Sequence, residues 1–321
     1  MPDLSVGGQA VIEGVMMRSK DRVSTAVRIP SGEIVVKTED YKSLTTRRKI
    51  FGLPIIRGII TFFEMLVIGI KTLNFSADVA VRELEKEEAA AKGETYEDKP
   101  RKSSSLVLAG TAVIAVALGV LIFFFLPLAI STLFNVNREA VAFNLVAGVI
   151  RIILFLLYVW GISLFGEFKK VFQYHGAEHK SIFAYENGEE LTTANVGRYS
   201  TQHPRCGTSF ILIVALFAIF IYSISDTVYY LIAGVPPTLL KRFLIHFLLL
   251  PLVAGSSYEL LKLSGRTKDN FITGILIKPG LWLQKITTRE PSPQQMEVAI
   301  VALESALGKT ESSLTVKKTF L

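Results

Sequence analysis

The chain has 321 residues, of which 50% are hydrophobic and 20% are charged, and its net charge is +7. The apolar residues come in long blocks instead of being spread evenly, which is not the pattern of a soluble domain. Disorder is excluded by the high apolar content, and a disulfide-stapled secreted domain is excluded because one cysteine, Cys206, cannot form an internal bridge. The composition therefore predicts an integral membrane protein.

Residues 1–50 are predicted to form a small β-containing piece on the cytoplasmic side. The segments 24–29 and 33–37 are strand-like, and a Pro-Ser-Gly turn separates them. Ahead of them, the block 7–18 places three glycines around an apolar run, which indicates a tight turn or a close backbone approach. Gln9 and Glu13 of this block are candidates to line a ligand site, with Glu13 as a candidate catalytic carboxylate.

Residues 51–103 are predicted to form an amphipathic or re-entrant helix followed by a charged linker. Arg57, Glu64 and Lys71 are spaced by seven, so on a helix they fall on nearly one stripe. This pattern favours a helix that lies in the membrane interface or packs against other polar groups over one that crosses the membrane. Crossing remains an alternative, and it would move the N-terminal region to the other side.

Four further apolar stretches are long enough to cross a membrane, because a spanning helix needs about 20 mostly apolar residues. Short connections join the first to the second and the third to the fourth. The predicted fold is therefore a mainly α-helical membrane protein with four transmembrane helices arranged as two hairpins within residues 104–262. The stretches cover residues 106–134, 140–165, 210–225 and 243–261.

Three polar side chains inside these stretches need an explanation. Arg151 and Glu259 are secondary site candidates, because a charge within a membrane helix marks a buried partner or a functional cavity. Asp226 and Glu259 are the candidate counter-ions of Arg151. His246 stands alone in an apolar helix, where a polar side chain usually bonds across to another helix.

Lysine and arginine are concentrated before the first span, between the second and third spans, and after the fourth. By the positive-inside rule this places the N-terminus, the segment 166–207 and the C-terminal tail in the cytoplasm. Residues 263–321 are predicted to form interfacial and amphipathic helices, with the apolar segment 271–288 broken at Pro279 and Gly280. The first 28 residues lack the pattern of a signal peptide.

The residues best suited to chemistry lie in the segment 166–207. His175, Glu178 and His179 form an H-x-x-E-H motif, and His203 and Cys206 form an H-x-x-C motif. On a helix, residues four apart share a face, so both histidines of the first motif can point at one ion. Imidazole and thiolate ligands suit Zn²⁺ well, and Fe²⁺ or another transition ion is an alternative.

The number of ligands decides the role of such a site. If His175, His179, His203 and Cys206 all bind, the site is closed and structural, whereas three ligands leave a position for water. In the second case Glu178 is the predicted general base, as in inverted zinc-peptidase motifs. A competing use of the same residues is a Cys206 thiolate activated by His203.

Four blocks of the sequence resemble the YqhQ-like family of bacterial membrane proteins. The family is of unknown function and has been described at most as metal-dependent enzymes, so the resemblance implies a bacterial inner-membrane location and supports the metal site. It supplies no substrate and no assigned residues. The blocks are GGQAVIEGVMMR at 7–18, YHGAEHK at 174–180, HPRCGTSF at 203–210, and PGLWLQ at 279–284 with TTREP at 287–291.

Two functions remain open on the sequence alone. The first is a zinc-dependent hydrolase that acts at the cytoplasmic membrane face on a lipid-linked or membrane-protein substrate. The second is a non-catalytic membrane assembly or biogenesis factor, in which a structural metal site holds the cytoplasmic segment and basic surfaces bind a ribosome, a translocon or another membrane protein. No sequence motif indicates specific nucleic-acid binding, and the absence of a repeat disfavours a transporter.

Overall fold

The computed structural model describes residues 6–94, 104–134, 140–264, 271–309 and 316–318. The chain divides into two compact units. The mixed unit combines residues 1–96, 161–209 and 269–321, and the helical unit combines residues 97–160 and 210–268. The N-terminal piece and the C-terminal helices, which the sequence analysis treated as separate regions, therefore belong to one unit with the His/Cys segment.

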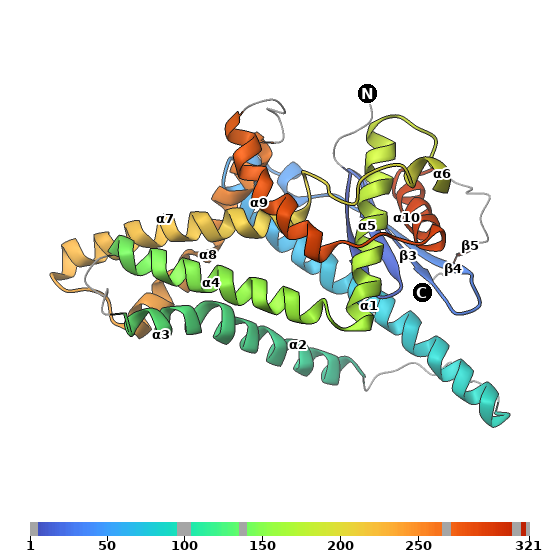
Figure 1. Ribbon diagram of the computed structural model, residues 1–321, viewed down its shortest axis with the longest axis horizontal. Coiled ribbons are helices and arrows are strands. Elements are labelled where there is room, and N and C mark those ends of the chain that lie inside the picture. The colour runs from blue at the N-terminus through green and yellow to red at the C-terminus, as the bar shows by residue number, and fades with distance from the viewer. Residues whose placement is uncertain (1–5, 95–103, 135–139, 265–270, 310–315, 319–321) are drawn as a thin grey trace. The chain divides into compact units, whose positions relative to one another are not determined.

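A five-stranded sheet forms the centre of the mixed unit (Figure 1). The first four strands pair as an antiparallel meander in chain order, and the last strand adds to β4 in parallel. The two strands predicted at 24–29 and 33–37 are confirmed as β3 and β4. The strands are β1 (Gly7–Val11), β2 (Gly14–Arg18), β3 (Arg22–Arg28), β4 (Ile34–Asp40) and β5 (Val316–Lys318).

The expected tight turn in the glycine-rich block is the two-residue connection between β1 and β2. Glu13 occupies this turn with a φ of 50°, a left-handed conformation that is unusual for a residue with a side chain. Its carbonyl oxygen accepts a hydrogen bond of 2.9 Å from the backbone N–H of Arg28. Gly14 is required next to it, because a Cβ there would overlap the carbonyl oxygen of Ala26 on β3.

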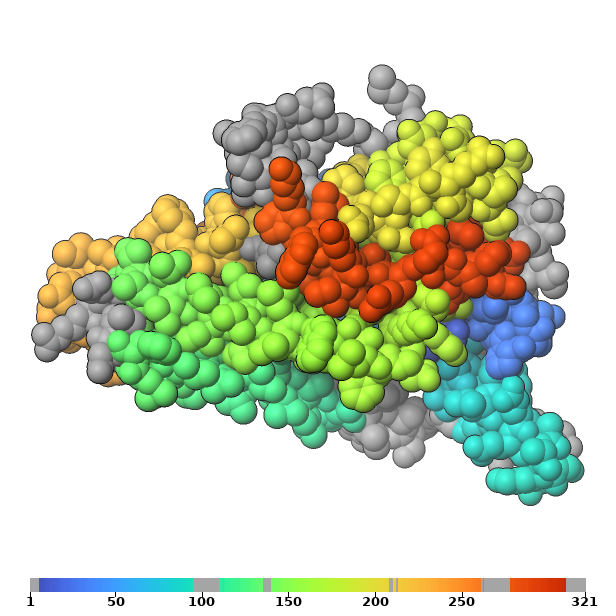
Figure 2. All heavy atoms as spheres, in the orientation of Figure 1, coloured from blue at the N-terminus to red at the C-terminus, as the bar shows by residue number. Residues whose placement is uncertain are grey.

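Helices cover both faces of the sheet, because β2 and β3 are apolar on both sides. Met17 packs with the helices α5 (Gly166–Glu186) and α10 (Pro293–Ala306) on one face. Met16 packs with α1 (Ile56–Lys92) on the other face, and neither methionine is exposed. In the space-filling view, atoms of α10 lie directly against those of α5 and of the segment that follows it (Figure 2).

Helix α1 runs unbroken for 37 residues, so the expected re-entrant alternative for its first half does not occur. Its residues Phe75 and Val79 are buried against the sheet. Glu64 of the predicted charged stripe accepts hydrogen bonds from the Tyr41 hydroxyl (2.6 Å) and the backbone N–H of Leu44 (2.6 Å). At this residue the stripe packs against other polar groups in the loop after β4, which was one of the two predicted alternatives.

The remaining elements of the mixed unit are short or lie after the fourth span. Helix α9 runs from Phe271 to Thr287 and continues through Pro279, where the sequence predicted a break. Ser292 caps α10 and forms a reciprocal capping box with Gln295. The short elements are η1 (Leu44–Thr46), η2 (Lys49–Gly52) and α6 (Thr193–Val196).

The helical unit confirms the four expected spans. Four helices are long and apolar enough to cross a membrane, over Val113–Thr132, Ala140–Ile162, Ile213–Ala233 and Leu239–Leu260. Their outward side chains are apolar, as expected for contact with lipid. The helices themselves are α2 (Ser104–Val120), the π-helical turn η3 (Leu121–Phe125), α3 (Leu126–Thr132), α4 (Ala140–Ile162), α7 (Gly207–Ala233) and α8 (Leu239–Ser264).

A buried ion cluster joins α7 to α8 within the helical unit. The Asp226 carboxylate lies 3.0 Å from Arg242 Nε and 3.0 Å from His246 Nε2, and it accepts a hydrogen bond of 2.9 Å from Asn144. His246 therefore bonds across to another helix, as predicted. Asp226 was also a candidate counter-ion of Arg151, but its two oxygens are occupied by these three partners.

We expect Met16→Ala and Met17→Ala to destabilise the protein by similar amounts, although the two side chains are neighbours. Both are fully buried on opposite faces of the sheet, and truncating a buried methionine costs about 2–5 kcal/mol. Thermal unfolding of the purified full-length protein in detergent would measure both. Lys20→Ala, at an exposed position between β2 and β3, is the control. A near-neutral result for either methionine would contradict burial on two faces.

Candidate metal centre

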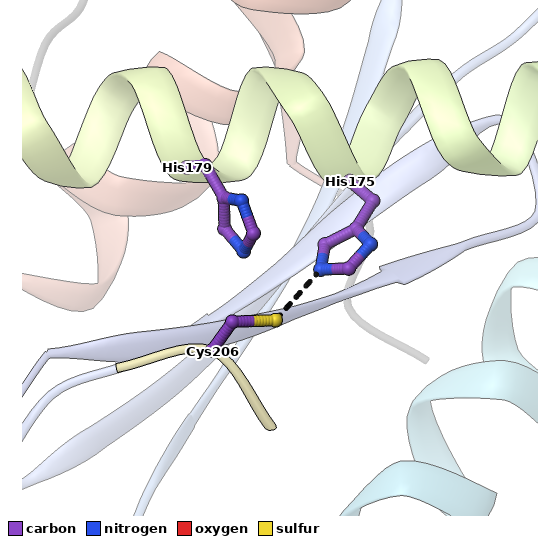
Figure 3. A group of neighbouring side chains, drawn as sticks. All are labelled: His175, His179 and Cys206. Carbon is purple, nitrogen blue, oxygen red and sulfur yellow. Dashed lines mark hydrogen bonds between the residues drawn. The ribbon is translucent and has the colours of Figure 1, made fainter. Parts of the chain in front are cut away.

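Three potential ligands meet in the mixed unit. His175 and His179 project from the same face of α5, and Cys206 directly precedes α7 (Figure 3). One ligand atom from each residue lies within 4.8 Å of the other two. His175 Nε2 is 3.3 Å from Cys206 Sγ, and the two imidazole rings are 4.4 Å apart between centroids. The structure thus brings together three of the four predicted ligands.

The other nitrogen of each ring is bound to a backbone carbonyl. His175 Nδ1 lies 2.9 Å from the Thr287 oxygen, and His179 Nδ1 lies 2.5 Å from the Thr201 oxygen. A carbonyl oxygen can only accept, so both Nδ1 atoms carry a proton, and in the neutral form of each ring the lone pair is on Nε2. Metal-binding histidines are typically oriented in this way by an outer hydrogen bond.

The surroundings of His179 favour its neutral form. His179 is 1% exposed, and burial lowers the pKa of its imidazole, so the ring is neutral at physiological pH. Its Nε2 atom is buried and makes no hydrogen bond of normal geometry to any described residue. A buried nitrogen of this kind is costly unless a ligand binds it. Cys206 is buried as well, whereas His175 is half-buried.

The carbonyl of Thr287 reaches α5 because the segment after α9 docks closely onto that helix. The backbone N–H of Arg289 donates a hydrogen bond of 2.9 Å to the Phe172 oxygen. One turn later, a Cβ on Gly176 would overlap the Arg289 carbonyl oxygen. The glycine in the H-x-x-E-H motif is therefore needed for the two segments to approach each other.

Lys180, the next residue after the motif, strengthens the same contact. Its ammonium group is almost fully buried, lies 2.5 Å from the Glu290 carboxylate, and donates a hydrogen bond of 3.0 Å to the Gly197 oxygen. A buried ammonium requires such partners. One lysine thus joins α5 to the loop after α6 and to the segment after α9.

His203 does not join the three clustered ligands, although the sequence predicted it as one. Its Nδ1 accepts a hydrogen bond of 3.2 Å from the Arg205 backbone N–H, and its Nε2 lies 3.6 Å from a Glu186 carboxylate oxygen. The ring packs on Phe183 at 4.4 Å between centroids.

The backbone of His203 has a separate structural role. The Gln284 amide receives a hydrogen bond of 2.7 Å from the His203 N–H and donates one of 2.9 Å to its carbonyl oxygen. Gln284 is fully buried in α9. This pair of bonds holds the loop that carries Cys206 against α9.

Glu178 lies beside the cluster, facing the sheet. It is 5% exposed, and its carboxylate accepts a hydrogen bond from the backbone N–H of Gly8. Burial raises the pKa of this carboxyl, and the nearby His175 and His203 rings oppose the shift. Gly8 is required here, because a Cβ would come within 2.6 Å of the Met16 carbonyl oxygen and 2.9 Å of Glu178 Cγ. The glycine-rich block therefore contacts the H-x-x-E-H motif through Gly8 and not through the two residues that were predicted to line a site.

The other two candidates of the glycine-rich block lie elsewhere. The Gln9 side chain packs on α1 at Gly69, where a Cβ would come within 2.8 Å of its amide oxygen. Glu13 forms an ion pair of 2.8 Å with Lys170 and accepts a hydrogen bond from the Tyr174 hydroxyl at 3.4 Å. Both residues connect structural elements and neither belongs to the His/Cys cluster.

The sequence did not identify the residues that orient the ligands. The outer partners Thr201 and Thr287 act through backbone carbonyls, which no residue type signals. Gln284, Lys180 and Glu290 fall within the blocks that carry the family resemblance. The sequence of a block does not show which segments its residues contact, so their role could not be inferred. The residues Arg151 and Glu259 belong to the helical unit.

The fold and the cluster define a class: a multi-span helical membrane protein with an α/β unit that carries two histidines and a cysteine in ligand geometry. The chain belongs to the family described as "Protein of unknown function (DUF1385)", whose model matches residues 53–309. It is 34% identical over 309 residues to the "Uncharacterized protein YqhQ" of Bacillus subtilis (strain 168), covering 94% of this chain and 92% of that protein. No solved structure matches it.

We expect Gly176→Ala to destabilise the protein by about 1–3 kcal/mol, because the new Cβ must displace the Arg289 carbonyl. Alanine is otherwise favoured over glycine within a helix by about 1 kcal/mol. Gly166→Ala is the matched control, since it lies in the same helix and its Cβ would meet no atom within 4 Å. Thermal unfolding should show a loss for the first variant and none for the second; equal behaviour would refute the close approach.

We expect Glu178→Gln to weaken the pH dependence of stability. Because burial raises the folded-state pKa of Glu178 above its usual 4.5, the folded protein holds this proton at pH values where the unfolded chain has lost it. Stability therefore falls as the pH rises above 4.5, and glutamine removes that fall. Unfolding temperatures at pH 5 and pH 8, with a chelator present, would measure the difference. Glu189→Gln, at an exposed position, should keep the wild-type slope.

Proposed function

We propose that this protein is a membrane-bound, zinc-dependent hydrolase whose ion is held by His175, His179 and Cys206. The observation that carries the proposal is the pair of Nδ1 contacts with backbone carbonyls, which leaves both Nε2 lone pairs directed at the thiol. Histidines that only pack in the core or form a hydrogen bond between two segments do not require both Nε2 atoms to point at the same thiol. The donor set of two imidazoles and one thiolate suits Zn²⁺.

Three protein ligands distinguish a catalytic zinc site from a structural one, which usually has four. When bound, the cation would lower the pKa of a coordinated water molecule to about 7 and so supply a nucleophile at neutral pH. The half-buried side of His175 offers an approach to the cluster, whereas His179 and Cys206 are buried. This arrangement supports a hydrolytic site more than a closed metal knot.

Glu178 is the proposed general base. Burial raises the pKa of the Glu178 carboxyl, which makes its carboxylate a stronger base than an exposed one. The hydrogen bond from the Gly8 N–H fixes one side of the carboxylate. The proposed role is to take a proton from the attacking water and to return it to the leaving group.

The location of the proposed substrate follows from the order of elements along the chain. The His/Cys segment runs between two candidate membrane spans that end at Ile162 and begin at Ile213. The excess of lysine and arginine in this segment favours the cytoplasmic side of a bacterial inner membrane, with both termini on that side. A substrate at this position would be a lipid-linked molecule or a membrane protein.

We expect the purified full-length protein to contain about one zinc ion per chain, and His175→Ala, His179→Ala or Cys206→Ser to lose most of it, because each removes one of three ligands. His203→Asn should retain the metal, since the His203 ring faces Glu186 and asparagine can still accept the Arg205 N–H. Elemental analysis after gel filtration measures the content. Metal-free wild-type protein that also fails to take up added zinc would overturn the proposal.

The number of ligands separates the hydrolase from the alternative, a membrane assembly factor with a structural metal site. X-ray absorption of the zinc-loaded protein should show two nitrogens, one sulfur and one further light-atom ligand that exchanges with solvent. Glu178→Gln should keep the metal but shift the pH titration of the cobalt-substituted protein, because the proposed general base is lost. Four protein donors, with no effect of Glu178→Gln on that titration, would support the structural site instead.

A further inference from the structure

The helical unit contains an apolar cavity that is separate from the His/Cys cluster. Its volume is about 390 Å³, which lies within the range of about 300–1,000 Å³ typical of small-molecule sites. The cavity lies between the helices α2, α4 and α7, and its lining is almost entirely apolar. Its lining residues include Gly119, Val120, Phe155, Ala218 and two polar residues, Arg151 and Tyr222.

Arg151 is held at the cavity by a backbone group that has lost its normal partner. The Phe123 carbonyl would bond the N–H of residue 127 in a regular helix, but residue 127 is proline and has no N–H. Arg151 Nε donates a hydrogen bond of 3.0 Å to this carbonyl instead. The guanidinium carbon lies 5.4 Å from the centroid of the Phe124 ring, which adds a cation–π contact.

These contacts satisfy only part of the guanidinium. The Arg151 Nη2 atom is buried and makes no hydrogen bond to any residue that the structure describes. The Tyr222 hydroxyl is also buried and has no partner among them. The tyrosine ring is fixed by parallel stacking on His246, with centroids 4.1 Å apart, and lies 6.0 Å from the guanidinium carbon.

The cavity therefore presents two unpartnered groups that can donate, and its described lining residues include no carboxylate. Asp226, the carboxylate in the neighbouring ion cluster, is already bonded by Arg242, His246 and Asn144. An unpaired charge and an unpaired hydroxyl are costly within a membrane-spanning region, where water cannot solvate them. A ligand that brings an anionic oxygen into this apolar cavity would satisfy both groups at once.

We propose that this cavity binds a single-chain amphiphile whose small anionic head meets Arg151 and Tyr222 while its apolar chain fills the cavity. Arginine binds carboxylate and phosphate equally well in geometric terms, so a fatty acid and a monoalkyl phosphate share the required chemistry. Arg151 stands near the middle of α4, so the head lies deeper than the head groups of ordinary membrane lipids. The site is independent of the proposed hydrolase function.

Photoaffinity labelling of the full-length protein in nanodiscs tests the proposal. The probes are a diazirine analogue of palmitate, the corresponding alkyl phosphate, and the palmitate methyl ester, each titrated to obtain an apparent Kd. At least one acidic probe should label cavity peptides, and the methyl ester should bind about tenfold more weakly, because a charge-assisted hydrogen bond is lost. Comparison of the two acids identifies the preferred head.

Three variants assign the binding to the named groups. Arg151→Met should weaken the acidic probe about tenfold or more, and Tyr222→Phe should weaken it about fivefold, without removing the bond between Arg151 and the Phe123 carbonyl. Gly119→Phe should block the chain, because a Cβ at Gly119 meets no atom within 4 Å and the ring can enter the cavity. Gly110→Phe, on the same helix and equally unobstructed, is the matched control.

The result that overturns the proposal is equally specific. Equal binding of the methyl ester and the acids would show that the cavity binds apolar chains without discriminating a charged head from a neutral one. Unchanged labelling in both Tyr222→Phe and Gly119→Phe would place the bound probe elsewhere. Since both variants keep the Arg151 contact with the backbone, a folding defect of Arg151→Met would leave the test intact.

Discussion

The candidate metal centre depends on two contacts between imidazole nitrogens and backbone carbonyls. They join His175 to the end of α9 and His179 to the loop at Thr201, so three segments far apart in the sequence fix the state of two neighbouring rings. A histidine on an exposed helix would exchange tautomers freely, and its lone pair would have no fixed direction. The bonds to the carbonyls remove that freedom, and the remaining nitrogens converge on the only cysteine of the chain.

This geometry requires close packing, which small and buried polar residues make possible. Gly176 lets the backbone at Arg289 touch α5, and Gly8 lets β1 touch Glu178. Gln284 and Lys180 then bond the approaching segments in place. The ligands are therefore positioned by the core of the mixed unit, in which α5 lies between the sheet and the C-terminal segment. Disturbing this core displaces ligands without altering any of them.

The sequence predicted those parts of the structure that are marked by a repeating pattern of apolar residues or by a characteristic residue type. Apolar length identified the four spans, and the spacing of His175 and His179 placed both rings on one helix face. The sequence could not show that α1 covers a sheet. A helix that is apolar on two sides has the same sequence pattern whether it contacts a membrane or β-strands. The sequence also grouped His203 with the ligands, since spacing carries no information about the Glu186 carboxylate and Phe183 ring that its side chain faces. The sequence could not identify the carbonyls that orient the two histidines, because every residue has a backbone carbonyl.

Buried polar atoms differ in what they imply, and the difference depends on whether their partners are present. In the helical unit, the Asp226 carboxylate is engaged by Arg242, His246 and Asn144, and it acts as a structural joint between helices, although His246 Nδ1 has no hydrogen-bond partner among the described residues. His179 Nε2, Arg151 Nη2 and the Tyr222 hydroxyl make no hydrogen bond of normal geometry to the described residues. The first lies beside Cys206, and the other two line an apolar cavity. An unsatisfied buried polar group destabilises the folded chain, so it is expected where a bound ligand or another interaction offsets that loss of stability. Two of the places where such groups occur are the candidate metal centre, where the proposed cation would use the lone pairs, and the apolar cavity, where the proposed anionic head would meet Arg151 and Tyr222.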